Sequence, residues 1–231
     1  ESFPKNTTVL LHACCHNPTG ADITEAQWQQ VIDICKKKEL IPFLDMAYQG
    51  FAAGIEQDGI AVRLFAQSGM SFFVSSSFSK SFSLYGERVG ALSIVTQSKD
   101  ESARVLSQLK RVIRTNYSNP PTHGGAVVAA VLQSPELRQT WEKELESMRV
   151  RIRSMRQQLV DGLRSAGVKV DMGFITQQVG MFSYSGLSQA QMIRLRTEFG
   201  VYGTDTGRMC VAALNQHNIG HVCQSIAAVL A

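Results

Sequence analysis

The chain has 231 residues, of which 44% are hydrophobic and 18% charged, and its net charge is +4. This composition provides a substantial core and disfavours disorder, while the scattered basic residues disfavour a nucleic-acid-binding protein. Their densest run, Lys36–Lys38, lies at a predicted helix end, where cations complement the helix dipole. No apolar stretch reaches membrane-spanning length and no signal peptide leads the chain, so we expect a cytoplasmic protein.

The cysteine pattern indicates neither disulfides nor a metal site. The five cysteines are Cys14, Cys15, Cys35, Cys210 and Cys223. Their odd number and irregular spacing fit no disulfide framework and no zinc site. Cys14 and Cys15 belong to an apolar run and are predicted to be small buried residues.

The first hundred residues alternate between strand-like and helical patterns. Strands are predicted over 9–15, 40–45, 71–77 and 91–96. A helix begins after Thr24, with Gln27 in the capping-box position, and ends near Lys38. This alternation of strands and helices predicts an α/β fold with a mostly parallel sheet. Because a fully apolar strand needs neighbours on both sides, we expect the domain to begin before Glu1.

The later residues are predicted to be mainly helical. Helices are expected over 100–117, about 122–133, and from Pro135 to about residue 166. The third carries an apolar stripe formed by Trp141, Leu145, Met148, Ile152, Met155, Leu159 and Leu163. Arginines off this stripe are predicted to face solvent; they are Arg149, Arg151, Arg153 and Arg156.

The tail resembles a small α+β unit. Strands are predicted over 168–171, 180–186 and 207–214, and helices over 188–200 and from Asn218, as the cap, to about Leu230. The predicted organisation is therefore part of a large cofactor-binding domain (1–134), a long linking helix (135–166) and a small C-terminal α+β domain (167–231).

Polar residues follow three of the predicted strands. Asn17 lies in "HNPTG", Asp45 and Tyr48 lie in "DMAYQG", and Ser77 and Lys80 lie in "SFSK". Ligands of open parallel sheets bind at the carboxyl ends of the strands. We therefore predict that one crevice collects these side chains.

This set suits a pyridoxal phosphate site on chemical grounds. Lys80, set among serines and aromatic rings, would form the Schiff base, because partial burial lowers the pKa of an amine and makes it nucleophilic. Asp45 would keep a proton on the pyridine nitrogen, so that the ring acts as an electron sink. Tyr48 and Asn17 would hydrogen-bond the phenolic oxygen of the ring.

Two further residues would hold the phosphate. Ser77 offers a hydroxyl, and the planar guanidinium of Arg88 matches phosphate oxygens. Each candidate also has a purely structural explanation: a loop lysine, an aspartate helix cap, or a surface pair between Arg88 and Glu87. Taken singly these explanations are preferred, but their coincidence at successive strand ends is improbable.

The motifs "HNPTGADIT", "DMAYQGF" and "SFSKSFSLYGERVG" resemble those of the fold-type I aminotransferases, which depend on pyridoxal phosphate. Within that family the aspartate and aromatic-amino-acid subgroup is the most similar. The resemblance continues, in the same order, through "RTNYSNPP", "GMFSYSGLS" and "GRMCVAALN". It implies an incomplete large domain of the pyridoxal-phosphate transferase type, followed by the smaller domain.

The resemblance also implies roles for individual residues. Lys80 would hold the cofactor and move a proton between the substrate Cα and the cofactor C4′. Arg208 would bind the substrate α-carboxylate, with Asn17 and Phe182 close to the substrate. Arg114 would reach the neighbouring subunit's site and bind a side-chain carboxylate, which implies a homodimer with shared active sites.

Two departures from the family pattern affect this interpretation. Asp205, in the unusual "GTDT" (203–206), puts an acid near Arg208 and would weaken or reorient the carboxylate clamp. The family's leading segment, which supplies a closing loop, a ring-stacking aromatic residue and part of the phosphate cup, is absent. The Asn17–Pro18 peptide is expected to be cis, as the family implies.

The sequence therefore predicts a transaminase. It would exchange an amino group between an aromatic amino acid or aspartate and 2-oxoglutarate by a ping-pong reaction. Two alternatives remain open. One is a lyase or decarboxylase that uses the same cofactor, and the other is a catalytically incomplete fragment that acts only in folding or assembly.

Overall fold

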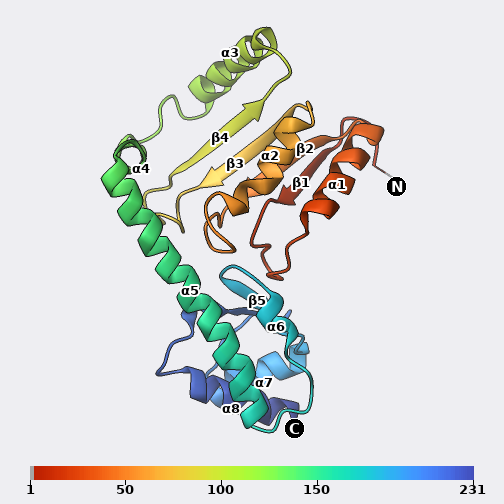
Figure 1. Ribbon diagram of the computed structural model, residues 1–231, viewed down its shortest axis with the longest axis vertical. Helices are drawn as coiled ribbons and strands as arrows, with labels where there is room; N and C mark the ends of the chain where they lie inside the picture. The colour runs from red at the N-terminus through yellow and green to blue at the C-terminus, as the bar shows by residue number, and fades with distance from the viewer. Residues whose placement is uncertain (1–2) are drawn as a thin grey trace. The chain divides into compact units, whose positions relative to one another are not determined.

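The computed structural model describes residues 3–231, and these form two compact units (Figure 1). Unit 1 contains the described residues up to Cys14 together with Ile23–Gly50 and Gly54–Glu144. Unit 2 contains Cys15–Asp22, Phe51–Ala53 and Leu145–Ala231. The division falls within one long helix, and the two units are described separately below.

Unit 1 is built on a four-stranded sheet with the order β1-β2-β3-β4. The strands are β1 (Thr8–His12), β2 (Ile41–Met46), β3 (Phe72–Ser77) and β4 (Gly90–Val95). The first three strands are parallel, and β4 is antiparallel to β3. The prediction of a mostly parallel α/β sheet is confirmed, although the first strand ends at His12 and does not include the two cysteines.

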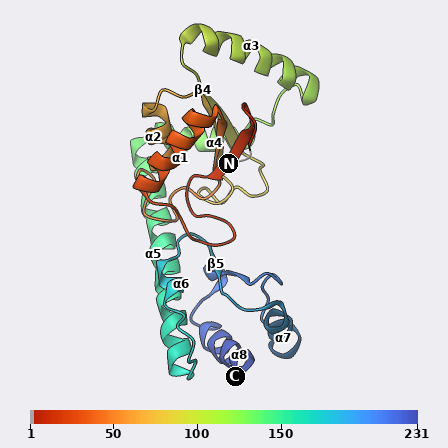
Figure 2. The same ribbon diagram turned by 90° about the vertical axis from the view of Figure 1, so that its right-hand side faces the viewer.

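Two helices cover one face of this sheet (Figures 1 and 2). Helix α1 (Glu25–Lys38) begins at Thr24 with both hydrogen bonds of the predicted capping box. It ends at Lys38, and the left-handed backbone of the C-cap Glu39 returns the chain to β2. A 3₁₀ turn, η1 (Gln57–Gly59), leads into α2 (Ile60–Gln67), and the sequence analysis identified neither.

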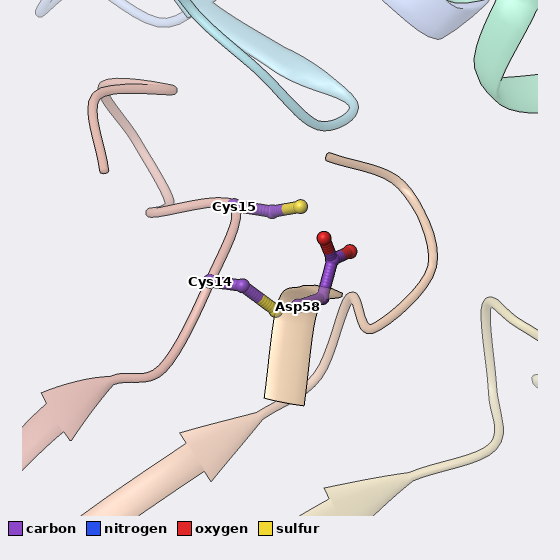
Figure 3. Close-up of side chains that lie close together, drawn as sticks. All are labelled: Cys14, Cys15 and Asp58. Atoms are coloured by element: carbon purple, nitrogen blue, oxygen red, sulfur yellow. The ribbon is translucent and has the colours of Figure 1, made fainter. Parts of the chain in front are cut away.

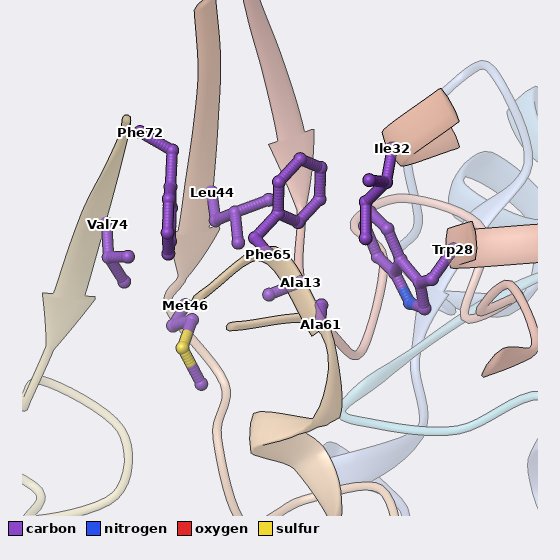
Figure 4. Packing of buried hydrophobic residues seen from close by; sticks show 9 residues of the cluster. All are labelled: Ala13, Trp28, Ile32, Leu44, Met46, Ala61, Phe65, Phe72 and Val74. Atoms are coloured by element: carbon purple, nitrogen blue, oxygen red, sulfur yellow. The ribbon is translucent and has the colours of Figure 1, made fainter. Parts of the chain in front are cut away.

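The core of unit 1 lies between these helices and the sheet (Figure 4). Phe65 of α2 is fully buried and packs edge-on against Trp28 and at a tilt against Phe72, with ring centroids 6.2 and 5.6 Å apart. Leu44 and Ile32 are also fully buried. Every second residue of β2 and β3 points into this core, as expected for strands with one face covered.

The opposite face of the sheet carries the alternate residues. Phe43 and Phe73 are register partners with ring centroids 5.6 Å apart. Asp45 lies on the same face, two residues beyond Phe43. Leu10 and Leu92 of this face are 61% and 53% exposed, so the face with Asp45 is the one that neither α1 nor α2 covers.

Three helices follow the sheet: α3 (Lys99–Asn116), α4 (His123–Gln133) and α5 (Pro135–Ser165), close to their predicted bounds. The first turns of α5 belong to unit 1. There the Trp141 ring stacks on Phe82, with centroids 4.4 Å apart, and its indole N–H donates to the Ser81 carbonyl at 2.6 Å. Helix α5 thereby holds the segment that follows Lys80.

Unit 2 is the smaller α+β part. Strands β5 (Phe182–Tyr184) and β6 (Arg208–Cys210) form an antiparallel pair. The helical elements are α6 (Phe174–Gln177), α7 (Gln189–Phe199), the 3₁₀ turn η2 (Val211–Ala213) and α8 (Ile219–Leu230). The core contains Leu159, Leu163, Met192, Leu195 and Ile226, each at most 1% exposed.

Two predictions for the tail are wrong, and two predicted strands are present but shorter than expected. No strand forms over residues 168–171, because the Val168 amide still bonds the Leu163 carbonyl at the end of α5 and the Asp171 carboxylate accepts from the Gly173 amide. The strands predicted over 180–186 and 207–214 have three residues each. Asn218 precedes α8 without capping it, because its side chain bonds Asn215 and Ala213 instead.

The prediction that the α5 arginines face solvent holds for Arg151 and Arg153, which are exposed, but is wrong for Arg156. Arg156 is only 2% exposed. Arg151 donates to the carbonyls of Ala212 and Leu214 at 2.7 and 2.8 Å. Helical spacing distinguishes apolar from polar positions, but it does not reveal when backbone carbonyls surround a guanidinium. Within residues 3–231, no helix is both long and apolar enough to cross a membrane.

Candidate active site

The first group of predicted site residues lies in unit 1, at the carboxyl ends of β2 and β3. Asp45 and Ser75 are register partners on these two strands. The Ser75 hydroxyl donates to Asp45 Oδ1 at 3.1 Å. This bond orients the carboxylate on the face of the sheet that α1 and α2 leave uncovered, and sequence reasoning had not assigned any role to Ser75.

Lys80 and Tyr48 meet in the same unit. The Lys80 Nζ lies 4.5 Å from the centroid of the Tyr48 ring, and Tyr48 is only 7% exposed. A lysine at this distance from an aromatic face is held by a cation–π contact. The half-buried ammonium therefore lies against a buried ring instead of extending freely into solvent.

The turn after β3 places Lys80. The Ser77 hydroxyl accepts from the Ser79 amide at 3.2 Å, and the Phe78 amide donates to the Val89 carbonyl at 3.1 Å. The Lys80 carbonyl accepts from the Ser83 amide at 3.2 Å. These bonds form a compact turn, so Lys80 lies in a segment whose backbone is held by hydrogen bonds.

Ser77 and Arg88, the predicted phosphate ligands, are not hydrogen-bonded to each other within the described residues. Arg88 is exposed, has a left-handed backbone (φ 54°), and donates from Nη1 to the Tyr85 carbonyl at 2.9 Å. Ser77 is the last residue of β3 and pairs with Gly90 of β4. The assignment of both residues to a phosphate remains a prediction.

The second group lies in unit 2. Arg208 donates from Nη1 to Asn17 Oδ1 at 2.9 Å, and its guanidinium carbon lies 4.7 Å from the centroid of the Phe182 ring. Three residues from distant parts of the sequence thus form one cluster, which we call the carboxylate clamp. The Asn17–Pro18 peptide is cis, as the sequence analysis expected.

A network of short-range bonds shapes the loop that carries Asn17. The Asp22 carboxylate accepts from the amides of Cys15 and His16 at 2.7 and 2.8 Å. The His16 ring and the Thr19 hydroxyl are 2.6 Å apart. Such side-chain bonds to nearby backbone are typical of fixed turns, so His16 has a structural role here.

Asp205 does not oppose Arg208 as expected. Its carboxylate pairs with Arg196 at 2.9 Å, and hydrogen bonds from Arg196 and Gln189 hold the pKa of Asp205 below its ordinary value. The unusual "GTDT" turn instead contributes Thr204, whose hydroxyl accepts from the Arg208 amide at 3.1 Å. The predicted weakening of the clamp by Asp205 therefore has no support in these contacts.

Arg114 is exposed on α3 and belongs to neither group. Its Nη1 donates to the Ser118 hydroxyl at 2.5 Å. A contact with a neighbouring subunit stays a prediction.

One buried acid was missed by sequence reasoning. Asp58 is 4% exposed and accepts from the amides of Gly50 and Gly54 at 2.8 and 3.2 Å. Its carboxylate and the Cys14 thiol lie within 4.8 Å of each other (Figure 3). The backbone bonds give Asp58 a structural explanation, since it fixes the loop that follows Tyr48.

Comparison with known proteins identifies the fold and the motifs. The sequence matches the family described as aminotransferase class I and II over residues 1–226. The chain belongs to this family. The structure is similar to that of the aromatic-amino-acid aminotransferase from Burkholderia pseudomallei covalently bound to pyridoxal phosphate, with a TM-score of 0.98 and 66% identity. That similarity covers 100% of this chain and 58% of the other.

Relatives of this chain include aspartate and aromatic-amino-acid aminotransferases. It is 65% identical to an aspartate aminotransferase of Pseudomonas aeruginosa and 54% identical to an aromatic-amino-acid aminotransferase of Escherichia coli. Each alignment covers 100% of the chain and 58% of the relative. The chain therefore spans somewhat more than half the length of these relatives, and the family assignment of the sequence analysis is confirmed.

Proposed function

We propose that this protein is an aminotransferase that uses pyridoxal phosphate to exchange an amino group between aspartate or an aromatic amino acid and 2-oxoglutarate. The observation that carries the proposal is the placement of Lys80 against Tyr48 within a chain of this family. A relative with a very similar structure is covalently bound to the same cofactor.

The side chains of unit 1 fit this cofactor. A carboxylate at the edge of the sheet is oriented by a serine hydroxyl, and a half-buried amine lies over a buried phenol ring. An acid, an amine and a phenolic hydroxyl are the groups that a pyridine ring with an aldehyde and a ring oxygen requires. When bound, pyridoxal phosphate supplies an electron sink that stabilises negative charge on the carbon beside the amino group.

Each candidate residue of unit 1 would then have a separate role. Asp45 would hold a proton at the ring nitrogen, and Tyr48 would donate its hydroxyl to the ring oxygen. Lys80 would hold the cofactor and afterwards move a proton between the substrate Cα and C4′, a general acid–base role of about 10²–10⁴-fold in rate. Ser77 and Arg88 would take the phosphate, which requires the Arg88 guanidinium to leave the Tyr85 carbonyl.

The carboxylate clamp of unit 2 would bind the substrate. The planar guanidinium of Arg208 offers two parallel N–H groups to an α-carboxylate. Asn17 fixes one edge of that guanidinium and Phe182 supports its face. The substrate carboxylate would meet a cation that is already oriented, so little ordering remains to be done on binding.

We further propose a homodimer in which Arg114 of one subunit serves the active site of the other. Arg114 is exposed and bound only locally in the described residues, so it is accessible for such a contact. A relative from Psychrobacter was cocrystallised with aspartic acid. A second carboxylate of that kind needs a second cation, which Arg114 would supply.

The experiment is a transfer assay with ¹⁵N-labelled glutamate and the 2-oxo acid of aspartate or tyrosine. Label in the newly formed amino acid, with loss of the glutamate signal, supports the aminotransferase. Release of labelled ammonia or of carbon dioxide would instead support a lyase or decarboxylase. An Arg114→Leu variant should lose transfer from glutamate and retain transfer between an aromatic amino acid and an aromatic 2-oxo acid, which is measured without any dicarboxylate.

The alternative is a chain that is inactive alone and acts only in folding or assembly. The assay separates the two. Purified chain 1–231 that binds no added cofactor, shown by an absorbance spectrum equal to the sum of the separate spectra of protein and cofactor, supports the assembly role.

A further inference from the structure

Arg156 is a buried arginine for which the proposed mechanism has no use. It lies on α5, in the part of the helix that belongs to unit 2, and is 2% exposed. Its Nη2 donates to the carbonyls of Gly180 and Phe182, both at 2.7 Å. Its Nη1 bonds the hydroxyl of Ser183, which is fully buried.

All of these acceptors are neutral. Among residues 3–231, no carboxylate forms an ion pair with Arg156. Burial lowers the pKa of Arg156 to about 10, so the side chain is still a cation at neutral pH. Burying a cation is costly unless it is well hydrogen-bonded. A hydrophobic residue would fill the same space at a lower cost in free energy. Packing alone therefore does not explain the buried guanidinium.

The segment that Arg156 binds is β5 and the two residues before it. Carbonyls two residues apart along an extended chain point the same way, and one nitrogen of the guanidinium bridges the carbonyls of Gly180 and Phe182. A lysine carries its three donors on one nitrogen, so it cannot reproduce the planar fork that places Nη1 on Ser183 and Nη2 on the two carbonyls. The contact therefore fixes both the position and the rotation of β5.

The carboxylate clamp rests on this strand. Phe182 supplies the ring beneath the Arg208 guanidinium, and β6, which carries Arg208, pairs with β5. The loop that carries Asn17 also contacts β5, because a Cβ on Gly20 would lie 2.6 Å from the Phe182 carbonyl oxygen. The Val179 amide donates to the Gly20 carbonyl at 2.7 Å. Arg156 thus holds the one element that all three clamp residues share.

We propose that Arg156 is a positioning residue for substrate carboxylate binding. It acts through β5, which sets the geometry among Asn17, Phe182 and Arg208, and does not itself touch the substrate. The proposal rests on the proposed function, since it concerns the affinity of the clamp for a substrate carboxylate.

The test compares Arg156→Met with Leu163→Ala in the purified holoenzyme. Leu163 is a buried residue further along α5, in the same unit, and has no part in the clamp. Arg156→Met should raise the KM for 2-oxoglutarate and the Kd for succinate, a dicarboxylate that cannot react, by about 10- to 100-fold, since a small misplacement of a binding group costs that much. Its kcat should change less than about threefold.

Leu163→Ala should lower Tm but leave the KM and the succinate Kd unchanged. Arg156→Lys, which keeps the charge, should fall between Arg156→Met and the unmodified protein. If Arg156→Met does not fold, Ser183→Ala removes one acceptor only and should raise the succinate Kd severalfold.

Unchanged succinate affinity in Arg156→Lys and Ser183→Ala, or a KM change of equal size in Leu163→Ala, would overturn the positioning role. Unmodified protein that neither binds succinate nor transfers an amino group would overturn the proposed function, and this inference with it. Amino transfer by unmodified protein, with an unaffected KM in the variants, overturns only the role of Arg156.

Discussion

The two groups of candidate site residues, one in each unit, are built in different ways. In unit 1, Asp45 lies near the end of β2, and Tyr48 and Lys80 lie in the turns after β2 and β3. The regular sheet thus places all three at the carboxyl ends of neighbouring parallel strands. In unit 2, Asn17 and Arg208 are 191 residues apart and meet through short loops and a two-stranded sheet. The first group needs little beyond a correct sheet, whereas the second depends on individual long-range hydrogen bonds.

This difference indicates where each group is vulnerable. The sheet of unit 1 is stabilised by a continuous apolar core, and single polar contacts add little to it. The β5–β6 pair of unit 2 is short, and a buried arginine with neutral acceptors holds it. We expect core substitutions to affect folding of unit 1 and polar substitutions to affect binding in unit 2.

The largest effect should come from Lys80→Ala. Losing the amine removes covalent attachment of the cofactor and the acid–base role, and we expect amino transfer to fall by at least about 10²–10⁴-fold. The measurement is the initial rate of amino transfer. Lys110→Ala, which alters an exposed lysine of α3, serves as the control and should retain full activity.

The cores of the two units should respond separately to truncation. Phe65→Ala, in unit 1, should cost about 3–5 kcal/mol of unfolding free energy, and Leu159→Ala, in unit 2, about 2–5 kcal/mol. Denaturant unfolding monitored by circular dichroism gives both values. If both variants left the midpoint unchanged, the described cores would be wrong.

A smaller effect is expected from Asn17→Ala. The Arg208 guanidinium would lose its bond to Asn17 Oδ1, and a hydrogen bond to a charged group contributes about 1.5–3 kcal/mol. We expect the succinate Kd to rise by about tenfold or more, as measured by calorimetry. Thr176→Ala, which removes a hydroxyl that donates to the carbonyl of Gly173 just before α6, is the control in unit 2.

The smallest effect should come from Asp205→Asn. Because the carboxylate pairs with exposed Arg196 and not with Arg208, the succinate Kd should not change at neutral pH. The pKa of Asp205 is lowered in the folded protein, so any stability it contributes is present above its ordinary pKa of 3.8 and is lost as the pH falls through the lower folded value. Comparing the Tm of the two proteins at pH 7 and pH 3 checks the direction of this stability effect. A lower succinate Kd in the variant would instead support the expectation that Asp205 weakens the clamp.

The sequence was most informative where local patterns decide the structure. The capping box at Thr24, the parallel strands and the residues that follow them are all consequences of short-range spacing and burial. For this reason the side chains of unit 1 were identified together with the strands that carry them. Ser75 was overlooked because a serine within a strand carries no pattern of its own.

Long-range contacts account for what was missed. The burial of Arg156, the pairing of Asp205 with Arg196 and the role of Asp58 depend on which distant groups come close in the fold. No periodicity in α5 distinguishes Arg156 from the exposed arginines beside it. The residues of the clamp were identified from family resemblance, but the element that supports them was not.

The central claim is that Lys80 holds pyridoxal phosphate, and mass spectrometry tests it most directly. The protein is incubated with the cofactor, reduced with borohydride to make the attachment permanent, digested, and its peptides are sequenced. The account predicts that the cofactor mass is found on the peptide with Lys80, and that an Asp45→Asn variant needs a higher cofactor concentration for the same labelling. Labelling spread over the exposed lysines, or labelling of equal extent in Lys80→Ala, would contradict it.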